Sequence, residues 1–214
     1  MIINDRIEMI TNSSVNCYLI SGSEGYVLID TGYYKDREKL ADYLSDKNVK
    51  IVLLSHGHID HIGGAKYIAD KFKAKIMMSF ADKEILINND LRKVYSDSLL
   101  GNVVKHISVS NFKKSHYDDL VIDDDICDGQ VIQLGDISIK AVKLPGHTKG
   151  SFGFIYSDYF FVGDALMNMM KPSLSLIYED RDDMLRSARI IKAKKIDNIC
   201  TGHGKPFSIT KISL

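Results

Sequence analysis

The sequence predicts an α/β protein made of two similar halves, each two layers deep. Short apolar runs of strand length alternate with amphipathic stretches of helical period. Segment 26–30 (YVLID) resembles 160–164 (FFVGD), and segment 50–58 (KIVLLSHGH) resembles 195–203 (KIDNICTGH). In both halves strands end in Asp or His, which indicates a duplicated unit.

The composition is typical of a globular protein and limits the kinds of partner that the chain is expected to bind. The chain has 214 residues, of which 45% are hydrophobic and 26% charged, and we assign residues 1–214 to a single domain. Lys+Arg and Asp+Glu both number 28, so the net charge of zero provides no overall field for nucleic acid or an anionic membrane. We therefore expect a small-molecule substrate, with neither nucleic acid nor a membrane as partner. The oligomeric state is left open.

Localisation is predicted from the amino terminus and the cysteines. The first ten residues carry acids and lack a long apolar core, so we expect no signal peptide. The apolar runs are strand-sized, and none could span a bilayer. Three cysteines, odd in number and far apart, are typical of a reducing compartment rather than of a disulfide framework. The prediction is a cytoplasmic protein.

Strands and helices of the first half follow from turns and periodicity. A Ser-Gly-Ser-Glu-Gly turn separates two strand-like runs, which predicts a hairpin. Leu40, Tyr43 and Leu44 share one helical face, and the IVLLS run that follows is typical of a buried strand. The expected elements are a hairpin over 14–21 and 25–30, a helix over 35–47, strands over 51–55 and 75–78, a helix over 65–72 and one further helix.

Residues 88–128 differ in character from both halves. They are polar and mixed in pattern, and they include His106, His116 and the acidic run at 123–125. We interpret them as an insertion over the surface, either a lid over the functional site or a solvated excursion without a role. Both histidines are expected to be structural or surface residues.

The second half is again rich in strands. Apolar residues alternate in the second arm of a predicted hairpin, and a Ser-Asp turn joins the next two strands. The expected elements are strands over 130–134, 137–144, 151–156 and 159–162, a helix over 180–194, and a strand over 196–200 that runs into Thr-Gly-His-Gly.

The stretch 55–64, SHGHIDHIGG, concentrates metal-ligand side chains. His56 and His58 do not share a helix face, but they can point the same way on the extended exit of a strand. Asp60 and His61 follow about one turn later, so one loop can present two pairs of ligands. Imidazoles and a carboxylate suit zinc, or iron and manganese in a more oxygen-rich site.

Further candidate ligands occur elsewhere in the chain. Four ligands so close in sequence cannot all surround one tetrahedral ion, so the cluster requires partners. His147, Asp164 and His203 each follow an apolar run and lie beside glycine, where the backbone can turn tightly. A lone histidine is more often structural, but together with the cluster these residues predict a metal site.

The motifs resemble those of a known family. SHGHIDHIGG, PGHTKGS, FVGDAL and TGHGKP, preceded by IDTG at 29–32, resemble the successive motifs of the metallo-β-lactamase-fold hydrolases, from about residue 10 to 207. This resemblance implies a four-layer αβ/βα sandwich of two mixed β-sheets flanked by helices. It places the functional site at one edge of the paired sheets.

The resemblance also implies roles for individual residues. One metal would be held by His56, His58 and His147, and a second by Asp60, His61 and His203, with Asp164 bridging the two. Asp30 would orient the ligand loop by hydrogen bonding, a role compatible with that of a helix N-cap or turn residue. Two zinc ions are the expected cofactors, with iron or manganese as alternatives.

The implied activity is metal-dependent hydrolysis of a small ester, thioester or lactone, as in the hydroxyacylglutathione hydrolase and lactonase-like branch. A hydroxide shared by the metals would attack the acyl carbon, and Asp60 would act as both ligand and proton shuttle. The family's true β-lactamases carry Cys or Ser at the position of Asp164, and its acyl-homoserine lactonases carry Tyr at that of Met167. Neither of those activities is expected.

Other functions remain open. Persulfide dioxygenases resemble these motifs but use a single iron held by two histidines and an aspartate. A phosphodiesterase and a metal-stabilised binding module without turnover are further alternatives. Substrate-binding residues are not assigned, although Tyr33, Tyr34, the 88–128 insertion and residues 166–170 are the expected substrate-facing parts.

Overall fold

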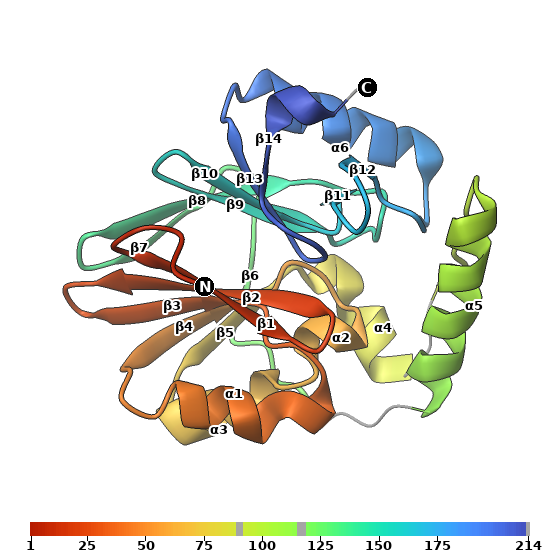
Figure 1. The fold of residues 1–214 in the computed structure, drawn as a ribbon. Coiled ribbons are helices and arrows are strands. Elements are labelled where there is room, and N and C mark those ends of the chain that lie inside the picture. Colours follow the sequence, from red (N-terminus) through yellow and green to blue (C-terminus); the bar gives the residue numbers. More distant parts are fainter. Residues whose placement is uncertain (89–91, 115–118, 213–214) are drawn as a thin grey trace.

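Two mixed sheets packed face to face, with helices on both outer surfaces, form the architecture of the computed structural model, which describes residues 1–88, 92–114 and 119–212 (Figure 1). Within these residues each large sheet has six strands. This is the predicted four-layer αβ/βα sandwich, and the fold class is confirmed. No helix of the described chain is long and apolar enough to cross a bilayer.

The first sheet contains strands that lie side by side in chain order. The first three strands are antiparallel, and the predicted hairpin pairs Tyr18 with Ile29. The remaining neighbours are parallel. The strands are β1 (Ile7–Asn12), β2 (Val15–Gly22), β3 (Gly25–Ile29), β4 (Val49–Leu53), β5 (Lys75–Met78) and β6 (Asp124–Asp125).

Helices α1 (Arg37–Tyr43) and α3 (Ala65–Phe72) cover the outer face of this sheet (Figure 1). The 3-10 turn η1 (Tyr34–Asp36) takes up the start of the helix predicted over 35–47, and α3 has the predicted bounds. Three short elements follow the ends of β4 and β5, and they are α2 (Ile59–Ile62), η2 (Phe80–Asp82) and α4 (Lys83–Asn88).

The second sheet has the order β14-β13-β10-β9-β8-β7. Its one parallel pair among the described residues joins β10 to β13. Helix α6 (Arg181–Ala193) covers its outer face, assisted by η3 (Ile209–Lys211). The strands are β7 (Val131–Leu134), β8 (Ile137–Lys143), β9 (Phe152–Tyr156), β10 (Tyr159–Gly163), β13 (Asn198–Thr201) and β14 (Phe207–Ser208), and a separate ribbon joins β11 (Leu166–Met167) to β12 (Ser173–Leu174).

Three apolar cores separate the four layers. The alternation in β8 shows how they arise, because Ile139 and Ala141 face the first sheet whereas Val142 faces α6. Phe154 and Phe161 lie in the core between the sheets and are almost completely buried. Burial on both faces makes the central strands continuously apolar, which is the pattern that identified them in the sequence.

The two halves repeat one arrangement. In the first, β1, β2 and β3 are antiparallel neighbours, and α1 leads from β3 to the parallel strand β4. In the second, β8, β9 and β10 are antiparallel neighbours, and α6 lies between β10 and the parallel strand β13. The similarity of 26–30 to 160–164 therefore corresponds to equivalent strands, β3 and β10.

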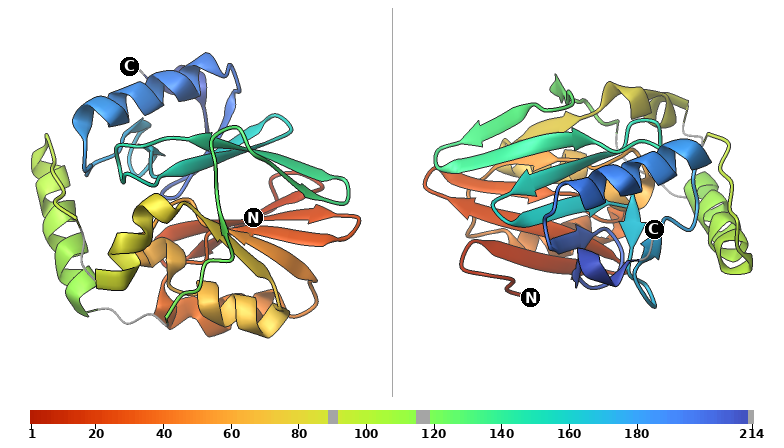
Figure 2. Two further views of the ribbon diagram at one scale, coloured as in Figure 1. Left: turned by 180° about the vertical axis from the view of Figure 1, so that it is seen from behind. Right: turned by 90° about the horizontal axis from the view of Figure 1, so that it is seen from above.

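The segment 88–128 departs from the sequence interpretation at two points. It contains a 16-residue helix, α5 (Leu99–Lys114), which the polar, mixed pattern did not predict. Its carboxyl end is not a surface excursion, because β6 extends the first sheet and Ile126 is buried between the sheets. The views of Figure 2 place α5 at the margin of the sandwich, apart from the helices that cover the sheets. His106 is exposed on α5, and His116 lies outside the described residues.

Candidate metal centre

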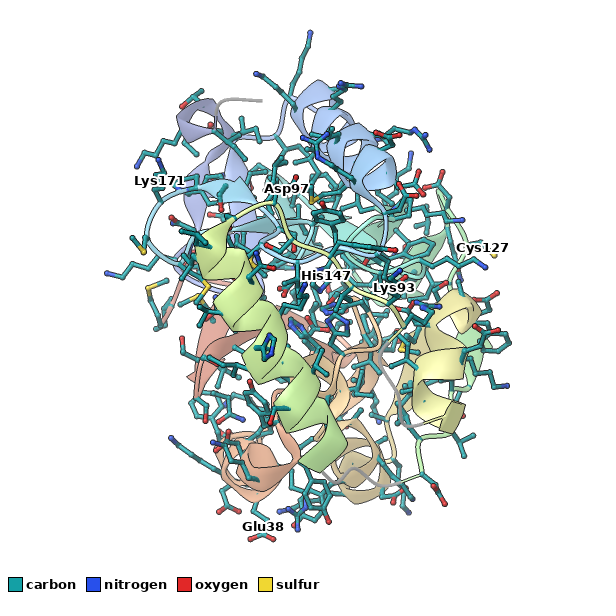
Figure 3. The ribbon with its side chains drawn as sticks, turned by 90° about the vertical axis from the view of Figure 1, so that its right-hand side faces the viewer. Glu38, Lys93, Asp97, Cys127, His147 and Lys171 are labelled. Atoms are coloured by element: carbon teal, nitrogen blue, oxygen red, sulfur yellow. The ribbon has the colours of Figure 1, made fainter. Side chains whose placement is uncertain are left out.

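The predicted ligand residues all follow the carboxyl ends of strands. His56 and His58 lie in the loop after β4, and α2 carries Asp60 and His61 immediately afterwards. From the second sheet, the exits of β8, β10 and β13 provide His147, Asp164 and His203. The structure brings all seven side chains together at one edge of the sandwich. Figure 3 shows one of them, His147, beside α5.

The first ligand group contains His56, His58 and His147. The Nε2 atom of His147 lies 3.2 Å from Nε2 of His56 and 2.9 Å from Nδ1 of His58. All three side chains are buried. Three imidazole nitrogens therefore converge on one point, the arrangement that a three-histidine metal site requires.

The second ligand group contains Asp60, His61 and His203. Oδ2 of Asp60 lies 3.3 Å from Nε2 of His203 and 3.9 Å from Nε2 of His61. Asp164 contacts both groups: its Oδ2 lies 3.3 Å from Nε2 of His203 and 3.7 Å from Nε2 of His147. Its Oδ1 lies 3.5 Å from Nε2 of His61, so Asp164 occupies the position of a bridge.

Asp30 orients one histidine of each group. Its Oδ2 accepts a hydrogen bond from Nδ1 of His61 at 2.8 Å and one from Oγ of Ser55 at 2.8 Å. With that proton donated, Ser55 Oγ accepts from Nδ1 of His56 at 3.0 Å. The backbone N–H of Ser55 donates to Oδ1 of Asp30 at 2.8 Å. These contacts assign the ring protons of both histidines to Nδ1 and leave Nε2 free to bind a cation.

Backbone carbonyls orient the rings of His147 and His203 in the same way, by accepting a hydrogen bond from Nδ1. His147 donates from Nδ1 to the carbonyl of Ile177 at 2.9 Å, and His203 donates from Nδ1 to that of Ser14 at 2.8 Å. In each ring Nδ1 is therefore engaged by a carbonyl, and Nε2 is the nitrogen that faces the site.

The residues fit divalent cations. His61 Nε2 and Asp164 Oδ1 are buried without a hydrogen-bond partner, although they face each other. Lone pairs that converge at about 3 Å repel one another unless a cation lies between them. Imidazole nitrogens with carboxylate oxygens form the donor set that zinc prefers, and that iron and manganese also accept.

Electrostatics distinguish the two groups. Burial, then the neighbouring imidazoles, lowers the pKa of His56 well below its ordinary value, and burial with His147 lowers the pKa of His58 to about 3. Burial also acts on His61, but Asp164 and Asp30 outweigh it and raise its pKa to about 9. His56 and His58 are thus neutral and ready to donate lone pairs, whereas a cation in the second group must displace protons from its histidines.

Asp60 and Asp164 are carboxylates. Burial opposes ionisation in both, but His61 and His203 outweigh it and hold the pKa of each acid below its usual range. The same acids raise the pKa of His203 well above its ordinary value against the effect of burial. The centre therefore keeps two negative charges for cations to neutralise.

A glycine makes the close approach of these ligands possible. A Cβ atom at Gly202 would lie 2.3 Å from Oδ1 of Asp164 and 2.6 Å from Cε1 of His61. Any larger residue would displace both ligands, which explains the glycine before His203.

Asp82, which sequence reasoning missed, joins the two histidine loops. This fully buried carboxylate accepts hydrogen bonds from the N–H of Gly57 at 2.9 Å and of Gly150 at 2.8 Å. It also accepts from Oγ1 of Thr148 at 2.6 Å. The loop that carries His56 and His58 is thereby fixed against the loop that carries His147.

Arg92 and Glu179 complete this connection. The Arg92 guanidinium pairs with Asp82 and donates from Nε to Oε1 of Glu179 at 2.7 Å. Glu179 in turn accepts from the N–H of Lys149 at 2.8 Å. The sequence gives little indication of this network, because Asp82, which follows Phe80 and Ala81, resembles an ordinary turn or cap residue.

The ligand groups open into a pocket of about 230 Å³. Tyr33 and Met167, both expected to face the substrate, contribute to its wall, and α5 contributes Val104, Ile107 and Ser108. Tyr34 was expected there too but lies instead against the Arg37 guanidinium, 3.8 Å from its ring centre. The other described lining residues are Ser14, His58, Ile59, Asp60, His147, Asp164, Met169, Ile177 and His203.

Known proteins share both sequence and fold with this chain. The uncharacterized protein YobT of Bacillus subtilis is 29% identical over 212 residues, covering 89% of this chain and 83% of its own. The hydroxyacylglutathione hydrolase GloC of Haemophilus influenzae is 28% identical over 213 residues, covering 96% and 93%. The subclass B3 metallo-beta-lactamase BJP-1 of Bradyrhizobium japonicum has a TM-score of 0.72 at 23% identity, covering 95% of this chain and 76% of its own, a likeness of fold alone.

The family assignment rests on a match along most of the chain. The model of the metallo-beta-lactamase superfamily matches residues 10–203, which include every predicted ligand from His56 to His203. With the fold and the histidine-rich site on the same edge, the chain belongs to the metallo-beta-lactamase superfamily.

Proposed function

We propose that this protein is a metal-dependent hydrolase, with two zinc ions, that cleaves an ester, thioester or lactone. The observation that carries the proposal is the pair of ligand groups joined by Asp164 and open to a pocket. The similarity to a hydroxyacylglutathione hydrolase, which by its name acts on thioesters, supports the acyl substrate class.

Two divalent cations held by these residues would supply Lewis acidity and a hydroxide nucleophile at neutral pH. His56, His58 and His147 would hold one, Asp60, His61 and His203 the other, with Asp164 shared. Asp60 lies both in the second group and on the pocket wall. Its carboxylate is therefore placed to accept a proton and to pass it to the leaving group. The phenol of Tyr33, on the same wall, is placed to donate a hydrogen bond to the substrate.

The first test is the metal content of protein purified without added metal or chelator. We expect close to two zinc ions per chain by elemental analysis, and turnover of some members of a panel of esters, thioesters and lactones. Removal of the metal should abolish that turnover, and added zinc should restore it. A protein that carries two zinc ions and cleaves no acyl compound would contradict the proposal.

Asp60 provides a sharper test of mechanism. We expect Asp60→Ala to lower kcat by at least about 100-fold, the scale of lost proton transfer, and to lower metal content much less. Asp42→Ala, at an exposed aspartate on α1, is the matched control and should change neither. If Asp60→Ala retained turnover with its metal bound, the proton-transfer role would be wrong.

One observation favours a second candidate, a mononuclear iron oxidoreductase of the persulfide dioxygenase type. His56, His61 and Asp164 also converge, and two histidines with one carboxylate form the ligand set of non-haem iron enzymes. The same metal analysis separates the candidates. One iron per chain, with oxygen consumed in the presence of a persulfide, would replace the hydrolase proposal.

A further inference from the structure

The pocket above the metal centre has one polar and one apolar side. Its floor is formed by ligands, among them Asp60 and Asp164. Its walls are formed largely by aliphatic and thioether side chains, which are Ile59, Val104, Ile107, Met167, Met169 and Ile177. The described lining residues that are neither apolar nor ligands are Ser14, Tyr33 and Ser108, so most of the wall offers no hydrogen bond to a polar substrate chain.

Exposed apolar residues continue this wall outward. On α5, Leu99, Val103 and Ile107 recur every fourth residue and are 88%, 57% and 54% exposed. Across the mouth of the pocket, Met169 and Met170 are 55% and 85% exposed. Ile107 and Met169 belong both to the pocket wall and to this exposed set, so the two are continuous. We call these five residues the entrance patch, a contiguous apolar surface of the kind that marks ligand-binding grooves.

The charges of the pocket point the same way. No lysine or arginine is among the described residues that line it. Lys149, next to His147, is exposed and lies outside the lining. A thioester that carries several carboxylates, such as a glutathione thioester, would find no lysine or arginine on the described wall with which to pair them.

We propose that the substrate carries a neutral aliphatic acyl chain. This inference rests on the proposed hydrolase function and specifies its substrate class. The scissile carbonyl lies at the ligand groups, and the chain passes between α5 and the methionines toward the entrance patch. Methionine suits this position because its unbranched thioether adapts to chains of different shape.

The activity test uses p-nitrophenyl esters from acetate to dodecanoate. Since burial of each methylene favours binding by about fourfold, kcat/KM should rise with chain length until the chain reaches the entrance patch. Val104→Ser and Ile107→Ser should each lower kcat/KM for the decanoate by about tenfold. The acetate, which does not reach α5, should change by less than about twofold. Val131→Ser, at a valine of β7 that is 57% exposed and lies outside both the pocket and the entrance patch, is the matched control and should alter neither ester.

A binding measurement separates this inference from the proposed function. N-phenyl-1-naphthylamine, a neutral apolar fluorophore, should bind the purified protein, and 2-dodecanone, which cannot be hydrolysed, should displace it. Ile107→Ser should weaken both interactions, whereas Val131→Ser should not.

The outcomes distinguish the two claims. Hydrolysis that is independent of chain length, or that favours S-lactoylglutathione over the decanoate, would leave the hydrolase function standing and overturn the acyl-chain inference. Displacement by 2-dodecanone that depends on Ile107, without hydrolysis of any ester, would support the apolar site and overturn the hydrolase function. Absence of both hydrolysis and displacement would overturn both.

Discussion

Asp30 shows how one residue can control ligands in both groups at once. Its carboxylate accepts one hydrogen bond from Nδ1 of His61 and another from Oγ of Ser55. The same Oγ accepts a hydrogen bond from Nδ1 of His56, so Asp30 orients His56 through Ser55. The residue has a φ of 58°, so the backbone turns sharply after β3 and directs the side chain beneath the ligand loop. A conformation that is uncommon for a non-glycine residue is thus maintained at a site where it serves function.

Replacing Asp30 by Asn should weaken metal binding without unfolding the protein. An amide keeps the shape, but it places an N–H group where His61 and Ser55 now donate, so the ring of His61 loses its orientation. We expect the affinity for the more weakly held metal to fall about 10- to 100-fold, as measured by competition with a chromophoric chelator.

Asp136→Asn is the matched control for this variant. Asp136 also accepts a hydrogen bond from the backbone N–H of Ser23 and forms an ion pair with Arg6, but it lies on an exposed turn away from the site. It should leave metal affinity unchanged. Equal metal affinity in Asp30→Asn and the natural protein would show that the Asp30 contact is dispensable.

At the residue scale, the clustering of the seven candidate ligands could be expected from the sequence, whereas most of the residues that support them could not. His147, Asp164 and His203 stand out in the sequence because residue type, preceding strand and neighbouring glycine coincide. Asp82 does not, because its described donors Gly57 and Thr148 lie 25 and 66 positions away. Local patterns carry no information about such pairings, which only the folded chain creates.

At the scale of elements, Asp82 and Arg92 fasten together loops that belong to different sheets. The loop after β4 also contacts the second sheet through the backbone N–H of Phe152, which donates to the carbonyl of Ser55 at 2.8 Å, and Asp82 adds hydrogen bonds from Gly57, Thr148 and Gly150. Asp82 is fully buried, and loss of its carboxylate would leave Glu179 and the carbonyl of Ala81 as the described partners of Arg92.

Asp82→Asn should therefore lower both stability and metal affinity. We expect a loss of about 3 kcal/mol, the lower end for breaking a buried pair, and hence a decrease in Tm of about 6 to 12 °C for a chain of this size. Calorimetry of the metal-free protein measures the first effect, and chelator competition at low temperature measures the second.

Asp70→Asn provides the comparison for Asp82. Asp70 pairs with Lys66 at 2.7 Å on the exposed surface of α3, where ion pairs contribute little. The Tm and the metal affinity of the Asp70→Asn variant should match those of the natural protein. A Tm for Asp82→Asn within 1 °C of that value would mean that the loops are held by other contacts.

Elements that pack on a sheet were predictable, whereas α5 was not. Helices α3 and α6 bury one apolar stripe each in a core, so their period is evident in the sequence. On α5, by contrast, Val104 and Ile107 face the pocket and Leu99 and Val103 are exposed. The sequence of this helix is also interrupted by Gly101, Ser108 and β-branched residues of low helix propensity. A helix shaped to contact a ligand does not show the pattern of a helix that contacts a core.

At the scale of the whole molecule, the centre lies where the two repeated halves meet. The first half provides His56, His58, Asp60 and His61, and the second provides His147, Asp164 and His203. His56 and His203 follow the ends of corresponding strands, β4 and β13, and Asp30 and Asp164 follow the corresponding strands β3 and β10. The duplication visible in the sequence therefore indicates where much of the site forms, although His147, after β8, has no counterpart in the first half. A cation held between the ligands of the two halves therefore joins one sheet to the other.

Metal removal should consequently destabilise the entire fold. A ligand that binds only the folded chain at a free concentration 1,000 times its Kd adds about 4 kcal/mol of stability. For a chain of this size, chelation should then lower Tm by about 8 to 16 °C, and added zinc should restore it, as followed by calorimetry. His147→Ala should reduce this chelator-dependent shift, because it removes a ligand that the second half contributes. His106→Ala, at an exposed histidine of α5, should preserve the shift in full. If the natural protein unfolded at the same temperature with and without chelator, the centre would not connect the halves energetically, and its ligands would be held in place by the protein scaffold alone.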